Sequence, residues 1–165
     1  MPDLPPDDVA KALERLHVAA FGWALHCCDG DRAAAEDALQ ASYLKVLDGR
    51  ARFDGRAAFK TWLFGVVRRT AAEERRRRAV WRFLSLEWLS PEAEAAPSER
   101  EDEAVRLRDA LSRLPGRQRE VLHLVFYQDL TIAEAGEVLG VSIGTARTHY
   151  ERGKAGLRRL MAEDA

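Results

Sequence analysis

Apolar residues along this chain return every three or four positions in most segments, which is the period of an amphipathic helix. Alternating runs of Val, Ile and Thr bounded by turns, which would indicate strands, are not found in the sequence. The pattern predicts helices over about 9–28 and 32–47, a third that includes Phe59, and further helical segments resuming at Val105 and Pro115. Outside 32–47, the apolar stripes expected to face a core are Val9, Leu13, Leu16, Ala20, Trp23 and Cys27, then Phe59, Trp62, Leu63, Val66, Val67 and Thr70, then Val105, Leu107, Leu111 and Leu114, and then Val121, Leu122, Val125 and Phe126. We therefore expect an all-α protein.

The stretch 131–160 predicts two helices joined by a tight turn. Thr131 is a good N-cap, and Glu134 three residues later completes a capping box. Gly140 ends the first helix with the one residue that adopts a left-handed backbone at little cost, and Ser142 caps the second helix. This arrangement is the helix-turn-helix pattern found in many DNA-binding proteins.

The second of these helices has an apolar face and a polar face. Positions expected to face inward are Ala146, Tyr150, Gly153, Leu157 and Leu160. The opposite face carries Thr145, Arg147, Thr148, His149, Glu151 and Arg152. Such side chains suit phosphates and base edges, although an ordinary helical hairpin with a solvated basic face has the same pattern. The helix-turn-helix alone favours DNA binding over that alternative without establishing it.

The helix predicted over 32–47 also has two distinct faces. One face carries Leu39, Tyr43, Val46 and Leu47, which we expect to lie in a core. The other face carries Asp37, Gln40, Ala41 and Leu44. A leucine beside an acid and an amide on an exposed face suggests a surface where another protein docks. On these residues alone, a solvated face with one isolated leucine is an equal alternative.

Charge is strongly divided along the chain, although the formal net charge is only −1. Residues 56–82 hold nine basic and two acidic side chains, for a sum of +7, and residues 143–160 hold five and one, for +4. Between them, residues 85–104 hold seven acids and one base, for −6. DNA affinity would therefore come from local segregation of charge rather than from a basic protein as a whole.

The acidic stretch also predicts how the chain divides into domains, because its prolines interrupt any helix. We expect two small helical domains over 1–80 and 105–165, joined by an acidic flexible linker over 81–104, after a loose leader over 1–8. A short apolar anchor in the linker would consist of Trp81, Phe83, Leu84, Trp88 and Leu89. Because the acidic segment can compete with DNA for both basic surfaces, we expect the free protein to be compact or inhibited.

Several classes of function are disfavoured by what the sequence lacks. No run of 18 apolar residues and no signal-peptide pattern occurs, so we expect a soluble, cytoplasmic protein without membrane insertion. No glycine-rich phosphate loop, nucleophile elbow or suitably placed carboxylate pair is visible, so neither an enzyme nor a cofactor is expected. Cys27 and Cys28 could bind a soft metal with His26, but half-buried thiols near a helix end are the favoured interpretation.

Two modules with basic surfaces, joined by an acidic segment, resemble bacterial sigma factors of the extracytoplasmic-function (ECF) group, which carry only sigma regions 2 and 4. The stretch LSRLPGRQREVLHLVFYQDLTIAEAGEVLGVSIGTARTHYERGKAGLRRL resembles region 4, and its Leu-Pro-x-x-x-Arg-Glu-Val start is more specific than the helix-turn-helix. AEDALQASYLKVL resembles the helix that binds the polymerase clamp. FDGRAAFKTWLFGVVRRTAAEERRRR resembles the segment that opens and reads the −10 element. The resemblance covers about Leu16 to Met161 and implies an alternative sigma factor.

The resemblance implies three binding surfaces and their partners. Contacts with the β′ clamp of core RNA polymerase are implied for Asp37, Gln40 and Leu44. Recognition and melting of the −10 element are implied for Phe53, Asp54, Arg56, Trp62, Arg68, Arg69, Arg75 and Arg76. Recognition of the −35 element is implied for Thr145, Arg147, Thr148, His149 and Arg152. The implied partners are core RNA polymerase through its β′ clamp and β flap, promoter DNA, and an anti-sigma factor.

The chain departs from the family pattern at several positions. Arg69 and Glu73 stand where the family usually has Asn and Asp, and Ala41 stands where Glu usually follows the clamp-binding Gln. The recognition helix carries Ala146, His149 and Tyr150 in place of the commoner Val, Arg and Leu. These changes leave the promoter sequence open but are compatible with helices.

Two other functions stay open at this point. A sigma-like mimic that only sequesters an anti-sigma factor would not need DNA-contacting arginines, which this chain has in both modules. A helix-turn-helix regulator with an N-terminal sensor domain would have a pocket in its first half and no clamp-binding face. The sequence therefore favours the sigma factor over both alternatives.

Overall fold

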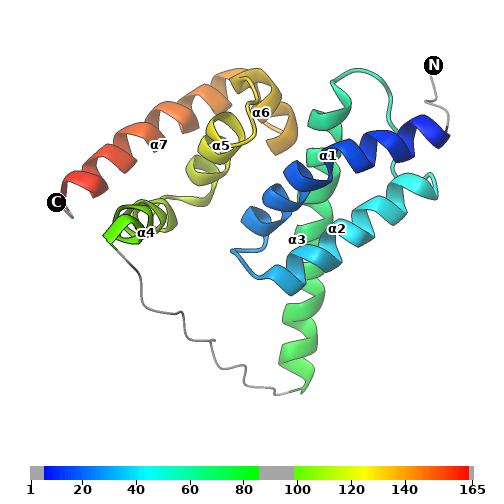
Figure 1. Cartoon of the computed structure of the whole chain (residues 1–165), viewed down its shortest axis with the longest axis horizontal. Helices are drawn as coiled ribbons and strands as arrows, with labels where there is room; N and C mark the ends of the chain where they lie inside the picture. Colours follow the sequence, from blue (N-terminus) through cyan, green and yellow to red (C-terminus); the bar gives the residue numbers. More distant parts are fainter. Residues whose placement is uncertain (1–5, 86–98, 164–165) are drawn as a thin grey trace.

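The structure is a computed structural model that describes residues 6–85 and 99–163, and every element within these ranges is a helix. The helices are α1 (Pro6–Cys27), α2 (Arg32–Leu47), α3 (Phe59–Ser85), α4 (Glu99–Ser112), α5 (Gly116–Phe126), α6 (Ile132–Leu139) and α7 (Ile143–Glu163). Figure 1 shows them as an N-terminal group, α1–α3, and a C-terminal group, α4–α7. The all-α prediction is confirmed. None of the described helices is long and apolar enough to span a membrane.

The N-terminal group packs around Trp23 of α1, whose side chain is completely buried. Its indole N–H donates to the carbonyl of Phe64 at 3.0 Å, so the polar end of the ring is satisfied inside the core. Ala35 and Ala38 of α2 are also fully buried, and their small side chains permit close packing of the helices. The apolar stripes predicted for α1 and α3 face this core.

Helices α6 and α7 form the predicted helix-turn-helix, and its caps are the predicted ones. The Thr131 hydroxyl accepts from the Glu134 N–H at 3.2 Å, and the Glu134 carboxylate accepts from the Thr131 N–H at 2.8 Å. Gly140 ends α6 with a φ of 67°, in the left-handed region that favours glycine. The Ser142 hydroxyl accepts from the Thr145 N–H at 3.1 Å and caps α7.

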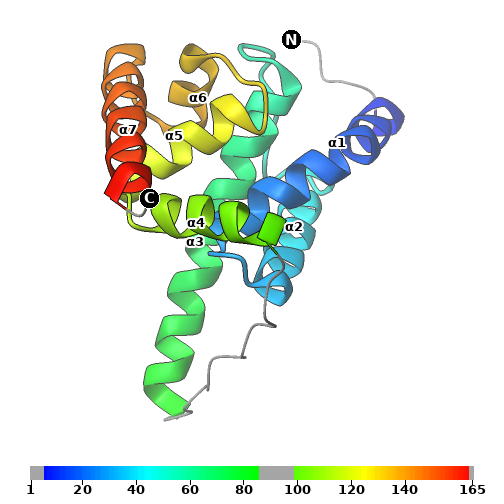
Figure 2. The same cartoon turned by 60° about the vertical axis from the view of Figure 1, so that its left-hand side comes forward.

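The two groups of helices share one hydrophobic core. Helix α6 packs on α3, and α5 packs on α1, as Figures 1 and 2 show from two directions. Leu63 and Phe64 of α3 belong to the same buried cluster as Leu124 of α5 and Val138 of α6. A smaller cluster holds α4 against α5 and α7. The sequence pattern predicted the inner faces of α1 and α3, but not that the C-terminal group would cover part of the N-terminal group.

The helices extend further into the predicted linker than expected. Helix α3 continues through residues 81–85, and α4 already begins at Glu99, so both ends of the 81–104 segment are helical. Neither end contains the proline or glycine that would stop a helix. The rest of the segment, including Trp88 and Leu89 of the predicted anchor, lies outside the described residues.

A few other expectations about individual residues are wrong. Helix α1 begins at Pro6, inside the expected leader, because proline is tolerated in the first turn of a helix. Leu47 and Phe126, both predicted to face a core, are each 59% exposed, since they are the last residues of their helices. Val105 is 40% exposed and precedes the part of α4, around Ala110, that is buried against α5 and α7.

Candidate promoter- and polymerase-binding surfaces

The outer face of α7 carries the residues predicted to read the −35 element. Arg147 and Arg152 are exposed, and neither has an ion-pair partner within the described part of the chain. The hydroxyls of Thr145 and Thr148 are hydrogen-bonded within the first turns of the helix. His149 is half-buried. The two arginines are therefore the side chains on this face best placed to reach phosphates and bases.

The inner face of α7 fixes the orientation of that outer face. Ala146 and Leu160 are buried, as predicted. Gly153 lies so close to α5 that a Cβ there would be 3.1 Å from the Leu122 side chain, which explains why glycine stands at this position. Because the inner residues pack tightly, a rotation of α7 that moved its arginines would disrupt the core.

Helix α2 exposes the three residues predicted to contact the polymerase clamp, and the Leu44 side chain is 53% exposed. A hollow of about 420 Å³ lies beside them between α1 and α2. Its lining residues are His17, Phe21, Arg32, Glu36, Leu39, Gln40, Tyr43 and Leu44. An exposed leucine at the edge of a hollow with apolar and aromatic walls is typical of a surface that receives another protein.

One of the predicted clamp-binding residues is already engaged by α3. Arg78 donates from Nη2 to Oδ2 of Asp37 at 2.6 Å, and its Nη1 lies 3.7 Å from Oδ2 of Asp31. The Asp37 side chain is still 61% exposed, so this ion pair is worth only about 0–1 kcal/mol. Arg78 thus connects the exposed face of α2 with the basic run of α3.

The loop before α3 folds back onto the first turns of that helix. Phe53, Phe59 and Trp62 pack against one another, and the ring centroids in each of the three pairs are 5.3 Å apart. The Asp54 carboxylate accepts from the Arg56 backbone N–H at 3.1 Å and lies 3.4 Å from its guanidinium. The half-buried Phe53 and Trp62 form an aromatic surface of the kind on which nucleic-acid bases stack.

The basic residues predicted to lie along the −10 strand divide into two groups. Arg69, Arg75 and Arg76 are exposed. Arg68 instead donates from Nε to Oε1 of Glu120 on α5 at 2.8 Å, with a second contact between Nη2 and Oε2 at 3.4 Å. The two side chains are only 24% and 19% exposed, so this ion pair is largely shielded from water. The structure therefore places Arg68 between the two groups of helices.

Two further polar contacts cross between the groups. Lys60 of α3 donates from Nζ to the carbonyl of Gln128 at 2.6 Å, and Arg119 of α5 lies 3.6 Å from Asp29 at the end of α1. Together with the Arg68–Glu120 ion pair and the shared core, these two contacts form what we call the domain contact. The sequence pattern predicted none of these polar pairs, whose partners are more than 50 residues apart along the chain. The hydrophobic period of a single helix carries no information about such pairs.

The two cysteines are free thiols, with Cys27 buried and Cys28 half-buried. Burial raises the pKa of both thiols above the usual range, which favours the protonated, less reactive form. No cluster of three or more potential metal ligands occurs in the described ranges. The burial of the two thiols fits the interpretation of half-buried thiols near a helix end.

Comparison with known proteins identifies sequence relatives. The Sigma-70 region 2 family matches residues 12–80, and the Sigma-70, region 4 family matches residues 104–157. The RNA polymerase sigma factor CarQ of Myxococcus xanthus is 35% identical over 133 residues, which cover 79% of this chain and 76% of CarQ. The ECF RNA polymerase sigma factor SigM of Mycobacterium tuberculosis is 32% identical over 127 residues, which cover 77% of this chain and 64% of SigM.

Solved structures share the fold. The sigma factor RpoE from Bartonella quintana, in complex with the anti-sigma factor NepR, aligns with a TM-score of 0.75 at 22% identity, over 96% of this chain and 99% of that one. CnrH, in complex with the cytosolic domain of CnrY, aligns with a TM-score of 0.67 at 22% identity, over 95% of this chain and 89% of CnrH. Because both conserved regions match in order and CarQ is similar over most of its length, the chain belongs to the sigma-70 family of RNA polymerase sigma factors.

Proposed function

We propose that this chain is an ECF-type alternative sigma factor of the cytoplasm that binds core RNA polymerase and directs it to promoters. Helix α2 docks on the β′ clamp, α3 and its preceding loop bind the −10 element, α7 reads the −35 element, and the C-terminal group meets the β flap. The observation that supports this most is the combination, on one chain, of an exposed docking face, an aromatic and basic helix, and a helix-turn-helix. The protein supplies binding and catalyses no reaction of its own.

Polymerase docking would combine an apolar anchor with polar contacts around it. The exposed Leu44 side chain would be the apolar anchor. The hollow beside it would receive a side chain of the polymerase. Gln40 and Asp37 are exposed next to them. The Gln40 amide can accept and donate hydrogen bonds at the rim, and the Asp37 carboxylate can accept them. An apolar centre with a polar rim is the usual construction of a protein interface.

Binding of the −10 element would use stacking and phosphate neutralisation. A base displaced from the duplex can stack against the surface formed by Phe53 and Trp62. The exposed guanidinium groups of Arg69, Arg75 and Arg76 can neutralise phosphates of the displaced strand. No reaction is needed, because strand separation is stabilised by binding the unpaired strand.

Simultaneous recognition of both promoter elements requires the domain contact to open. Elements 25 base pairs apart are separated by roughly 85 Å along B-form DNA, at 3.4 Å per base pair. A compact chain of 165 residues has a radius of gyration of only about 15 Å. We infer that the arrangement with the domain contact formed belongs to the free protein, and that promoter-bound protein has the two groups apart.

An anti-sigma factor is the further partner that we propose. RpoE of B. quintana is bound by the anti-sigma factor NepR in the solved complex. A mimic that only sequesters an anti-sigma factor is the second candidate function. The exposed arginines on both α3 and α7 count against it, since a mimic has no use for DNA contacts.

The test is run-off transcription from a genomic DNA library with purified core polymerase and this protein. The wild-type protein should direct initiation at a defined set of promoters. Asp37→Arg with Gln40→Ala should abolish both transcription and co-purification with core polymerase, with helicity and melting temperature nearly unchanged. The control Glu14→Arg, a matched charge reversal at an exposed position of α1 that does not line the hollow, should retain core binding. Wild-type binding by the double variant would refute the docking face, and absence of all transcripts would favour the mimic.

A further inference from the structure

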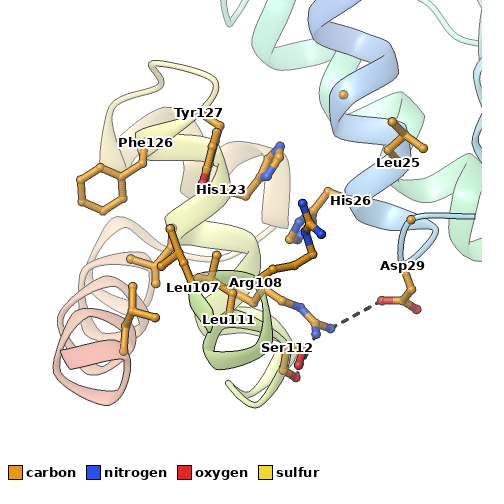
Figure 3. A pocket seen from close by; sticks show the side chains of 15 residues that line it. Leu25, His26, Asp29, Leu107, Arg108, Leu111, Ser112, His123, Phe126 and Tyr127 are labelled. Carbon is orange, nitrogen blue, oxygen red and sulfur yellow. Dashed lines mark hydrogen bonds and ion pairs between the residues drawn. The ribbon is translucent and has the colours of Figure 1, made fainter. Parts of the chain in front are cut away.

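Two histidines from different groups of helices meet in the domain contact. His26 lies near the end of α1 and His123 lies in α5, and their ring centroids are 4.3 Å apart with an interplanar angle of 31°. Figure 3 shows both rings at the wall of a groove that lies between the two groups. The groove has a volume of about 680 Å³, and its apolar lining includes Leu25, Leu107 and Leu111.

Aromatic rings pack against this histidine pair. Trp23 stacks on His26 at 5.3 Å between ring centroids and contacts His123 at 5.5 Å. Tyr127 also stacks on His123, at 5.3 Å. The remaining nitrogen contact is neutral, since Nε2 of His123 lies 3.3 Å from the amide nitrogen of Gln128. This contact is one that an unprotonated Nε2 of His123 makes by accepting from the amide.

The charged groups around the pair are mostly cationic. Arg119 of α5 and Arg108 of α4 line the groove with the two rings. The acid in the turn after α1, Asp29, is 3.6 Å from Arg119 and is thus paired with that arginine. Helix α7 contributes the apolar Leu157 to this groove, and α3 reaches the cluster through the Phe64 ring behind Trp23. Within the described residues, no carboxylate bonds to either imidazole.

We propose that the His26–His123 pair makes the domain contact sensitive to acid, so that mild acidification separates the two groups of helices and exposes the DNA-facing side of α3. This acid response is a property of the free protein, so it does not rest on the proposed binding to polymerase or promoter DNA. It would make the amount of open protein a function of pH.

The direction of the pH effect follows from whether the closed or the open protein binds protons more tightly at the two histidines. In the closed protein, burial and the Arg119 guanidinium lower the pKa of His26 to about 4, and burial and His26 lower the pKa of His123 to about 3. In the open protein each hydrated imidazole would return to a pKa of about 6.5. The open state therefore binds more protons, and the closed state is fully stable above pH 6.5 and weakens as the pH falls toward 4.

The size of the effect is set by the same values. At pH 5.5 each histidine should raise the ratio of open to closed protein about tenfold relative to neutral pH, and both together about a hundredfold. A single histidine of this kind gives a shallow response, whereas the pair gives a steep one. The ratio of open to closed protein changes strongly with pH because both His26 and His123 lie in the domain contact.

The test is energy transfer between dyes on the full chain from pH 7.5 to 5.0. The dyes are attached at Glu14→Cys on α1 and Ala155→Cys on α7, both exposed positions, with Cys28→Ser to prevent labelling there. Transfer should fall with pH while helicity by circular dichroism stays constant. His26→Gln and His123→Gln should each reduce the hundredfold response to about tenfold, and the double variant should remove it.

The matched control is His17→Gln, which removes an exposed histidine of the same helix outside the domain contact. It should leave the response to pH unchanged. Constant energy transfer in the wild-type protein, or a full response in both single variants, would overturn the proposal. Loss of helicity in parallel with loss of transfer would overturn it as well, because acid would then unfold the chain rather than separate its domains.

Discussion

The two helices that we propose to face DNA, α3 and α7, differ in how accessible their arginines are. On α7, Arg147 is exposed and, within the described residues, forms no ion pair. On α3, Arg68 is held by Glu120 of α5, and Arg78 is held by Asp37 of α2. The proposed −35 surface is therefore preformed, whereas the proposed −10 surface is partly occupied by the chain itself. We infer that the proposed −10 surface needs a rearrangement before it can bind DNA fully, and that the proposed −35 surface does not.

This difference shows that a count of charges overstates the charge available for binding. The segment 56–82 has nine basic residues and a sum of +7. At least five of the nine bond to groups of the protein, namely Arg56, Lys60, Arg68, Arg77 and Arg78. The remaining exposed arginines, such as Arg75 and Arg76, form the part of the surface that can meet phosphates directly.

The largest effect is expected from Glu120→Ala, which breaks the domain contact. Removing one partner of a fully buried ion pair costs about 3–5 kcal/mol, and for this slightly exposed pair we expect about 2–3 kcal/mol. The closed state would be weakened by roughly 30- to 150-fold, since a factor of ten corresponds to about 1.4 kcal/mol. Affinity for a single-stranded −10 oligonucleotide, measured by fluorescence anisotropy, should rise.

Glu137→Ala is the control for this experiment, because Glu137 is an exposed acid on α6 that forms no ion pair in the described structure. It should change neither domain separation nor oligonucleotide affinity. If Glu120→Ala also left domain separation and oligonucleotide affinity unchanged, the contact between Arg68 and Glu120 would not limit DNA binding by the proposed −10 surface.

The next effect in size should come from Arg147→Ala on the preformed surface. A well-placed contact between arginine and guanine discriminates by about 1–3 kcal/mol. Transcription from a promoter library should lose its dependence on the −35 sequence, while binding to core polymerase stays unchanged. Arg158→Ala, which removes the same charge further along α7, should have a smaller and sequence-independent effect. Uniform loss of activity across all −35 sequences with Arg147→Ala would instead identify a phosphate contact.

A smaller effect, visible mainly in salt dependence, should come from Arg75→Ala with Arg76→Ala. Each phosphate contact to a single strand contributes about 0.7 to the slope of log affinity against log salt concentration, so the slope should fall by about 1.4. Open-complex formation should weaken on all promoters alike. Arg15→Ala, an exposed site on α1, is the control and should keep the wild-type slope. An unchanged slope in the double variant would exclude these two arginines as phosphate contacts.

The smallest effect should come from Arg78→Ala, which frees Asp37 for polymerase. A solvent-exposed ion pair of this kind is worth about 0–1 kcal/mol, so core polymerase should bind at most about fivefold more tightly. Arg50→Ala removes the exposed ion pair with Asp48 instead, outside the residues that line the hollow, and should leave binding unchanged. Weaker binding of Arg78→Ala would mean that Arg78 itself contacts polymerase.

The sequence predicted local structure well, because its signals act over one turn of helix. The Thr131–Glu134 capping box, the left-handed Gly140 and the Ser142 cap all depend on residues within four positions of one another. The inner faces of α1 and α3 followed from the same short-range period. The exposed face of α2 was also predicted, since polar residues stand there at regular helical spacing.

The domain contact could not be predicted in this way. Arg68 and Glu120 are 52 residues apart, and each alone reads as a solvated surface charge. His26 and His123 are likewise uninformative until α1 and α5 are brought together. Only the packing of α6 on α3 reveals that part of the predicted −10 surface serves as an interface within the protein.

The most direct test of the account compares domain separation in the free protein with that in the promoter complex. The dyes at Glu14→Cys and Ala155→Cys report the distance between α1 and α7 across the domain contact. Addition of core polymerase and a promoter carrying both elements should abolish the energy transfer seen in the free chain, in the same sample that yields run-off transcript. Energy transfer that stays at the free-protein value in transcribing complexes would contradict the claim that the domains must separate to read a promoter.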